Sequence, residues 1–184
     1  MTPESEAIIH TANLMALAAR TAPKAKGVDT LQVRIVQGKE KEKLAAAMRT
    51  YGEEHGITFF SRDAKNVQDS AAVVLIGSDG VTTAGVDCGG CGYPACPTMI
   101  AAAKKRKKKK TAFAGPNCAI RMADLGIAVG SAVKTASVLN ADNRVMYSAG
   151  VAARTMGLLG KDCTVAFGIP LSATGKNIFF DRSR

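Results

Sequence analysis

The chain of 184 residues has the length of one main domain, and 47% of its residues are apolar, enough for a core. No apolar run reaches the roughly 18–20 residues of a membrane span, and the acidic start at residues 1–6 is not a signal sequence, so we expect a cytoplasmic protein with no membrane contact. The net charge of +10 is largely one run of seven basic residues at 104–110, which leaves +3 (10 − 7) elsewhere.

The first part of the chain alternates helical and extended patterns. Apolar residues recurring at helical spacing predict an amphipathic helix over 4–20, and alternation predicts a strand at 31–36. The segment 38–54, rich in Lys, Glu and Ala, predicts a surface helix. We expect a short strand at 57–60 and a central strand in the continuous apolar run 71–76.

The second part is mainly helical. We expect helices over 98–110, 119–139 and 144–159, the last capped by Asp142-Asn143, and a final strand at 163–167 that ends at Gly168-Ile169-Pro170. This order of elements predicts an α+β layered domain.

The segment 77–118 interrupts the layered pattern. It is rich in Gly and Cys at its start and carries the basic run near its end. We therefore divide the chain into one layered domain, made of 1–76 and 119–184, and an inserted segment at 77–118.

Four of the five cysteines lie in this insert. Cys88, Cys91, Cys96 and Cys118 have the spacing C-x2-C-x4-C-x21-C. Thiolates grouped this tightly in a loop are typical ligands of soft metals and iron–sulfur clusters. The interleaved glycines let the backbone curl around such a centre and bring N–H groups close to it.

Three other interpretations compete with a cluster. A disulfide scaffold is disfavoured by the length of the chain and the absence of an export signal. A structural zinc site also accepts four cysteines, although zinc ribbons normally show two C-x2-C pairs, whereas Cys118 stands alone. Free structural thiols would normally lie on an apolar face rather than in a Gly-rich loop.

The stretch Cys88-Gly89-Gly90-Cys91-Gly92-Tyr93-Pro94-Ala95-Cys96 resembles the C-G-x-C-G-x-x-x-C opening of a small [4Fe–4S] domain. That domain occurs in the Rnf-type electron-transfer subunit and in corrinoid iron–sulfur proteins. The resemblance implies that Cys88, Cys91, Cys96 and Cys118 ligate one [4Fe–4S] cluster. The fourth cysteine follows after more residues here than in that domain. Cys163 matches nothing in the motif, and we interpret it as a buried thiol that opens a strand.

A second resemblance covers most of the remaining chain. Ala18-Ala19-Arg20-Thr21-Ala22-Pro23 with the following strand, Asp124 to Ala128, and Val165 to Pro170 resemble three successive segments of FMN-dependent nitroreductases. The resemblance implies a nitroreductase-like fold, with helices packed on an antiparallel or mixed sheet, and a homodimer with a flavin between the subunits.

The whole pattern is also similar to a family of bacterial and archaeal proteins described only as containing a ferredoxin domain. The matching segments are Ala18 to Gly27, the cysteine motif, Gly115 to Asp124, Asp142 to Arg144, Gly168 to Ser172 and Gly175 to Arg182. This resemblance brings no activity of its own.

The flavin half of the nitroreductase pattern is incomplete. No arginine-rich phosphate motif precedes residue 20, and Lys24, Gly27 and Asp29 stand where nitroreductases carry polar flavin contacts. We name the basic residues that could instead meet an FMN phosphate or another anion. They are Arg20, Lys24, Lys26, Lys176 and Arg182.

The basic run 104–110 has three interpretations. It could be a solvated helix face, it could steer a small acidic redox carrier such as a ferredoxin toward the nearby cluster, or it could contact nucleic acid. We disfavour nucleic acid because no aromatic residues interleave with the run.

The sequence as a whole predicts an iron–sulfur redox protein. We expect one [4Fe–4S] cluster, with FMN as a second candidate cofactor, and electron transfer or flavin-linked reduction of a small substrate. The alternative is a binding or redox-sensing module that the cluster orders without turnover.

Overall fold

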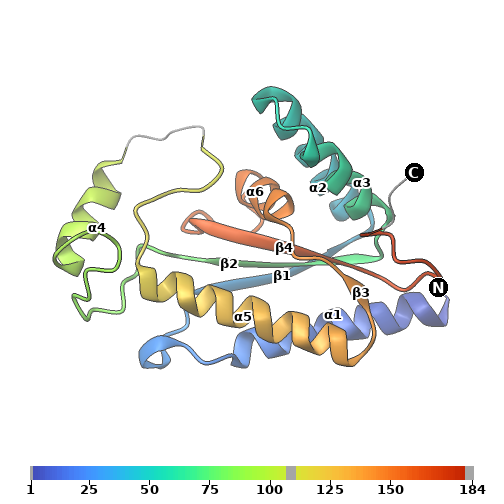
Figure 1. The fold of residues 1–184 in the computed structure, drawn as a ribbon, viewed down its shortest axis with the longest axis horizontal. Coiled ribbons are helices and arrows are strands. Elements are labelled where there is room, and N and C mark those ends of the chain that lie inside the picture. Colours follow the sequence, from blue (N-terminus) through green and yellow to red (C-terminus); the bar gives the residue numbers. More distant parts are fainter. Residues whose placement is uncertain (1, 107–110, 181–184) are drawn as a thin grey trace.

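The fold is built on one antiparallel sheet of four strands, which Figure 1 shows between two layers of helices. The computed structural model describes residues 2–106 and 111–180. The strands are β1 (Leu31–Gln37), β2 (Ala72–Ser78), β3 (Asp142–Asn143) and β4 (Val165–Ser172), in the spatial order β1-β2-β4-β3. Val33 pairs with Ile76, and Leu75 pairs with Gly168, so β2 lies between two full-length neighbours.

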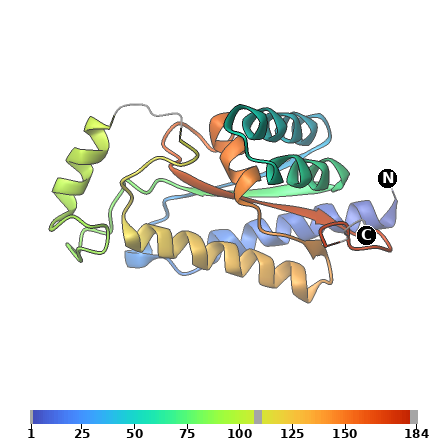
Figure 2. The same ribbon diagram turned by 45° about the horizontal axis from the view of Figure 1, so that its top comes forward.

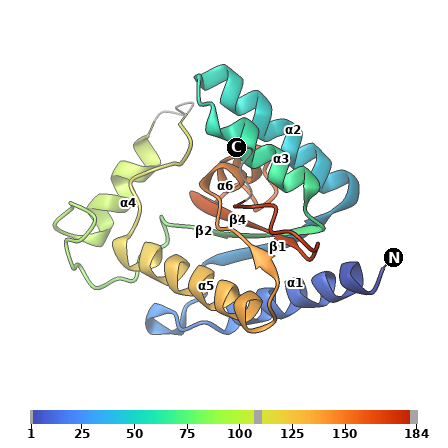
Figure 3. The same cartoon turned by 45° about the vertical axis from the view of Figure 1, so that its right-hand side comes forward.

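Helices cover both faces of the sheet, as Figures 2 and 3 show. Helices α1 (Pro3–Thr21) and α5 (Ala119–Val138) lie on one face, and α2 (Gly38–His55), α3 (Phe59–Asp69) and α6 (Tyr147–Thr155) lie on the other. Helix α4 (Cys96–Lys105) stands apart from both layers, at one end of the molecule (Figure 1). No helix within the described ranges is long and apolar enough to cross a bilayer.

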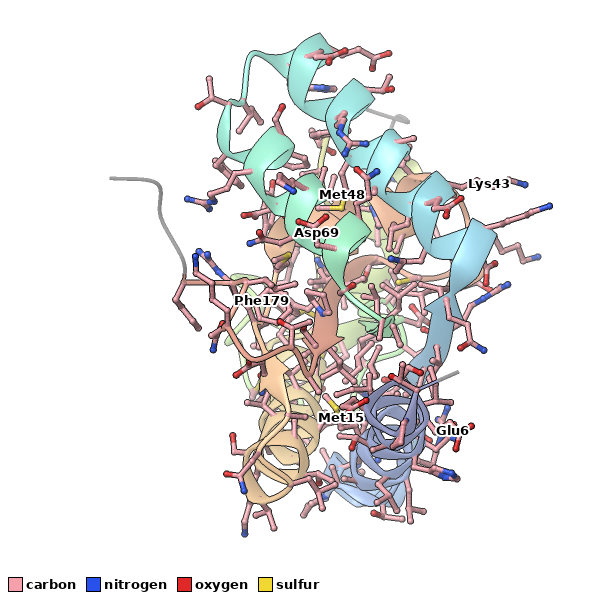
Figure 4. The ribbon with its side chains drawn as sticks, turned by 90° about the vertical axis from the view of Figure 1, so that its right-hand side faces the viewer. Glu6, Met15, Lys43, Met48, Asp69 and Phe179 are labelled. Atoms are coloured by element: carbon pink, nitrogen blue, oxygen red, sulfur yellow. The ribbon has the colours of Figure 1, made fainter. Side chains whose placement is uncertain are left out.

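The core has two halves, one on each face of the sheet. Val74 and Ile76 pack with Met15 under α1 and α5, whereas Val73 and Leu75 pack with Met48 under the other three helices. Figure 4 shows Met15 and Met48 on opposite sides of the sheet. Every residue of β2 is buried, because both of its faces are covered. This explains why the strand reads as a continuous apolar run.

The predicted α+β architecture is confirmed, but the short strand expected at 57–60 is wrong. Helix α3 begins at Phe59, and Phe60, Ala64 and Val67 form its buried stripe at helical spacing. A four-residue apolar run does not distinguish a strand from the start of a helix. Here the buried stripe that continues after residue 60 at helical spacing shows that the segment starts a helix.

The ends of the last two predicted elements also differ from the structure. Helix α6 covers only Tyr147–Thr155, because Met146 still pairs with Gly168 of β4 as extended backbone. Asp142 and Asn143 are not a helix cap but the short strand β3, which pairs with Ser172 and Leu171.

Strand β4 runs through Pro170 instead of ending there. Gly168 donates its N–H to the carbonyl of Met146, so the backbone nitrogen of Pro170, two residues on, faces the same edge. Pro170 falls between the bridge at Gly168 and the β3 pairing at Leu171, where no N–H is required.

The contact between α6 and β4 depends on a missing side chain at Gly150. A Cβ atom there would lie 1.9 Å from the carbonyl oxygen of Ala166, which is backbone and cannot move aside. We expect Gly150→Ala to lower the free energy of unfolding by about 3 kcal/mol or more. Gly126→Ala, in the middle of α5 with nothing within 4 Å of its Cβ, should instead raise it by about 0.5–1 kcal/mol. Urea denaturation of both variants measures the difference, and equal stability of the two would contradict this packing.

Candidate cysteine-ligated metal centre

The four cysteines of the insert line one cavity. Cys88 and Cys91 lie in the loop before α4, Cys96 is the first residue of α4, and Cys118 immediately precedes α5. The cavity is also lined by Thr83, Val86, Asp87, Gly89, Tyr93, Met99 and Ala119. Residues 30 positions apart in the sequence thus present their thiols to the same small space.

The solvent exposure of the four cysteines decreases along the chain, from Cys88 to Cys118. Cys88 is exposed, Cys91 and Cys96 are half-buried, and Cys118 is buried with 5% of its surface accessible. All four are free thiols. A centre held by them would have one exposed corner, at Cys88.

The loop curls through two residues in the left-handed region. Gly89 has φ +71° and Gly92 has φ +84°, and the Gly92 N–H donates to the Gly89 carbonyl at 2.9 Å. Side chains rarely adopt these angles, so the turn between Cys88 and Cys96 requires glycine there.

Asp87 closes the loop onto α4. Its Oδ1 accepts the backbone N–H of Cys96 at 2.6 Å, and this bond, with a further bond from the Cys96 side chain, lowers the pKa of the Asp87 carboxyl. The carboxylate thereby satisfies one of the unpaired N–H groups at the start of the helix.

Both arms of the insert are tied to the start of β4. The N–H of Gly80 donates to Oγ1 of Thr164 at 2.9 Å, and the N–H of Ala114 donates to the carbonyl of Thr164 at 3.0 Å. The arms also meet each other, because the Cys118 N–H donates to the Gly80 carbonyl at 2.7 Å. The sheet therefore fixes the position of Cys118.

The insert has a small core of its own. Ala84, Met99, Ala103 and Cys118 are buried together, separate from the two core clusters under the sheet. The cavity wall beside the cysteines is therefore apolar and tied to α4.

A buried ion pair within α5 contacts the loop that lines the cavity. Arg121, with 1% of its surface exposed, lies three residues after Cys118 and donates Nη1 to Oδ2 of Asp124 at 2.9 Å. It also donates to the carbonyls of Thr82 at 3.0 Å and Thr83 at 3.4 Å, on the loop that lines the cavity.

The same pair reaches the turn after α1. Nη1 of Arg121 donates to the carbonyls of Ala25 and Val28 at 3.2 Å, and Oδ1 of Asp124 accepts the N–H of Ala25 at 3.0 Å. Sequence reasoning missed this pair. The available signal was two opposite charges, three residues apart, in the otherwise apolar first half of the helix that directly follows Cys118.

Within residues 2–106 and 111–180, no three His, Cys, Asp or Glu side chains are grouped closely enough to hold a single metal ion. The four cysteines that line the shared cavity are therefore not gathered around a metal ion in this structure.

The FMN phosphate candidates are engaged with protein groups. Arg20 is ion-paired with Asp29, and Nζ of Lys24 donates to the carbonyls of Ala19 at 3.2 Å and Ala22 at 2.8 Å, at the end of α1. Lys26 donates to the Gly85 carbonyl at 3.3 Å.

The other two candidates do not join this group. Lys176 follows residues 172–174, which share a cavity with the first turn of α1, the opposite end of that helix from Arg20. Arg182 lies outside the described residues. The described candidates therefore do not gather around one pocket within a single chain.

The fifth cysteine is buried away from the others. Cys163 has 4% of its surface exposed, packs in the core under α6, and lies two residues before β4. Burial raises the pKa of its thiol to about 11, and the thiol donates to the Val165 carbonyl at 3.6 Å. It has the character of an inert core residue.

Comparison with known proteins identifies the family. Residues 114–182 match the family DUF2148, described as "Uncharacterized protein containing a ferredoxin domain". A curated relative from Archaeoglobus fulgidus, described as an uncharacterized protein, is 47% identical over 180 residues, which cover 98% of this chain and 94% of the relative. The chain belongs to this ferredoxin-domain family.

The solved structures that resemble this family member include nitroreductases. Nitroreductase CinD from Lactococcus lactis, in complex with chloramphenicol, superimposes with a TM-score of 0.60 at 12% identity over 98% of this chain and 86% of its own. A nitroreductase with bound FMN from Desulfitobacterium hafniense gives 0.58 at 14% identity over 96% and 92%. At this identity the likeness shows a shared fold.

We expect Arg121→Met to destabilise the protein strongly, because it leaves Asp124 charged and buried and removes the donors of four loop carbonyls. The loss should be about 3–5 kcal/mol in the free energy of unfolding. Lys65→Met, which breaks the exposed pair with Asp69, should cost less than about 0.5 kcal/mol. Denaturant titration of the two apo variants tests this, and a small effect of Arg121→Met would mean that the pair does not hold the loops.

Proposed function

We propose that the protein binds one [4Fe–4S] cluster through Cys88, Cys91, Cys96 and Cys118 and passes single electrons. The observation that carries the proposal is that these four thiols, and no other cysteine, line one cavity. The family's ferredoxin-domain description and the fold shared with nitroreductases both point to redox chemistry.

The residues around the cavity fit such a group. Four thiolates are the usual ligand set of a cubane, and Cys88, Cys91, Cys96 and Cys118 would supply them here. A bound cluster supplies reversible one-electron storage. The chain's own contribution is to hold the thiolates on the curled loop and on the starts of α4 and α5, and to exclude water on the side of Met99 and Tyr93.

FMN is the second candidate cofactor in this proposal. Its support is the fold shared with a nitroreductase that carries bound FMN. The candidate phosphate contacts within one chain are occupied by Asp29, helix carbonyls and the Gly85 carbonyl, so we derive no flavin step from them. A flavin would enable two-electron reduction of a small substrate, and its absorbance bands in the purified protein test for it.

The alternative is a module that the cluster orders without turnover. The separate small core of the insert favours it, because four thiolates bound to one centre would stabilise this core. Two experiments distinguish the two functions. Limited proteolysis of the apoprotein that removes the insert alone supports the module. Failure of every mild donor to reduce the cluster in the cluster-loaded protein also supports it. We place either activity in the cytoplasm, where thiols stay reduced.

A homodimer is part of the proposal. Leu14 and Leu17 of α1 and Val138 and Leu139 at the end of α5 border one open cavity and are 45–70% exposed. Large apolar side chains gathered on one outer face favour association with a second copy.

We expect Cys91→Ser to abolish the broad visible absorbance of protein purified without oxygen, because it removes a ligand. Cys163→Ser should leave the absorbance intact, since Cys163 lies outside the cavity. Cys118→Ala should leave a labile centre with about three irons. Equal loss of absorbance in the Cys91 and Cys163 variants would show that the ligand set is wrong.

We expect Leu17→Asp to convert a dimer into a monomer, because it places a charge in the apolar face. Val145→Asp, at a 40% exposed residue outside this face, is the matched control and should remain a dimer. Light scattering after size exclusion measures both masses. A wild-type monomer at micromolar concentration would remove the homodimer from the account.

A further inference from the structure

The exposed corner of the cysteine cavity lies at an end of the molecule that carries several basic side chains. Gly85 to Gly90 are all exposed, and this loop carries Cys88 and Val86, the latter 49% accessible. Lys26 reaches the loop from the turn after α1, with Nζ 3.3 Å from the Gly85 carbonyl. Lys104, Lys105 and Arg106 are exposed at the last turn of α4, the other end of this helix from Cys96. Together these residues form what we call the carrier face.

We propose that the carrier face docks a small acidic one-electron carrier. The inference rests on the proposed cluster, because the carrier would deliver its electron at the Cys88 corner. Figures 1 to 3 agree that the loop, the turn after α1 and α4 lie at the same end of the molecule. Basic side chains at the same end of the molecule as an exposed apolar residue and an exposed candidate ligand suit a small, transient redox contact.

The charge of this end of the molecule favours an acidic partner. The segment 77–118 carries seven Lys or Arg residues against two acids, Asp79 and Asp87. Asp87 turns its Oδ1 to the Cys96 N–H, and Asp79 binds the N–H groups of Val81 and Thr82, so both carboxylates serve the loop itself. Four of the basic residues, 107–110, lie outside the described residues, and the carrier face contains only the other three together with Lys26.

Lys26 is held toward the loop by its backbone. It has φ +56°, in the left-handed region that non-glycine residues rarely adopt. The neighbouring Ala25 is anchored on both sides, through its N–H to Asp124 and through its carbonyl to Arg121. The ammonium therefore has a fixed place beside the cysteine loop rather than a random place on the surface.

The reaction at this face is a single electron transfer. The reduced carrier would lose one electron, and a cluster held by the four cysteines would gain it, with no bond or proton changing place. Electrostatic attraction would raise the rate of encounter without altering the cluster.

The test uses protein whose iron content has first been verified and a reduced plant-type [2Fe–2S] ferredoxin as the acidic probe, mixed in a stopped-flow instrument. We expect the second-order rate constant to fall about tenfold or more as salt rises from about 20 to 300 mM. The double variant Lys26→Glu with Lys104→Glu should lose about tenfold at low salt. A second variant, Lys104→Glu with Lys105→Glu, keeps the turn at Lys26 intact and should behave alike.

The matched control reverses two charges elsewhere. Lys39 and Lys43 are exposed on α2, away from α4, and Figure 4 labels Lys43. Lys39→Glu with Lys43→Glu changes the net charge equally and should alter the rate less than about twofold. Reduced methyl viologen, a small cation, should reduce the clusters of all variants without slowing.

Several results would overturn docking at the carrier face. A rate independent of salt, equal loss in the α2 control, or equal slowing with methyl viologen would each do so. So would an unchanged ferredoxin rate together with salt-dependent binding of a random DNA duplex that the double variants lose, which would assign the face to nucleic acid. The iron content is measured before any rate. Purified protein that contains no iron would contradict the proposed cluster, which is a separate result from failure of docking at the carrier face.

Discussion

One buried ion pair holds the parts of this molecule in register. Arg121 and Asp124 tie the start of α5 to the turn after α1 and to the loop that lines the cysteine cavity. Burying two charges carries a desolvation cost, which their attraction offsets only when the surrounding hydrogen bonds are made. The pair therefore penalises arrangements in which either loop leaves α5, and Cys118 lies one helical turn away from it.

The layered scaffold explains why the insert can be small. Its two arms join at Gly80 and Cys118 and are fixed to Thr164 beside the sheet, so only a loop and α4 must order themselves around the cavity. The thiols grade from buried Cys118 to exposed Cys88. A centre placed there would be held by buried Cys118 on one side and would be accessible to a partner protein at exposed Cys88, which suits electron exchange.

Much of this could be predicted from the sequence where one physical signal dominates. The fully buried β2, the amphipathic α1 and the clustered cysteines are such cases. Prediction from the sequence failed where contacts with other elements determine the secondary structure. Pro170 continues a strand only because its nitrogen faces a gap in pairing, and Asp142 and Asn143 become a strand only because β4 lies beside them. The reach of Arg121 across three segments depends on contacts that no local pattern reveals.

The most direct test of the central claim is the count of metal and acid-labile sulfide in wild-type protein purified without oxygen. The account predicts about four irons and four sulfides per chain, with a paramagnetic signal that appears on one-electron reduction. A single zinc per chain without sulfide would contradict it, and would leave the four cysteines as a structural site.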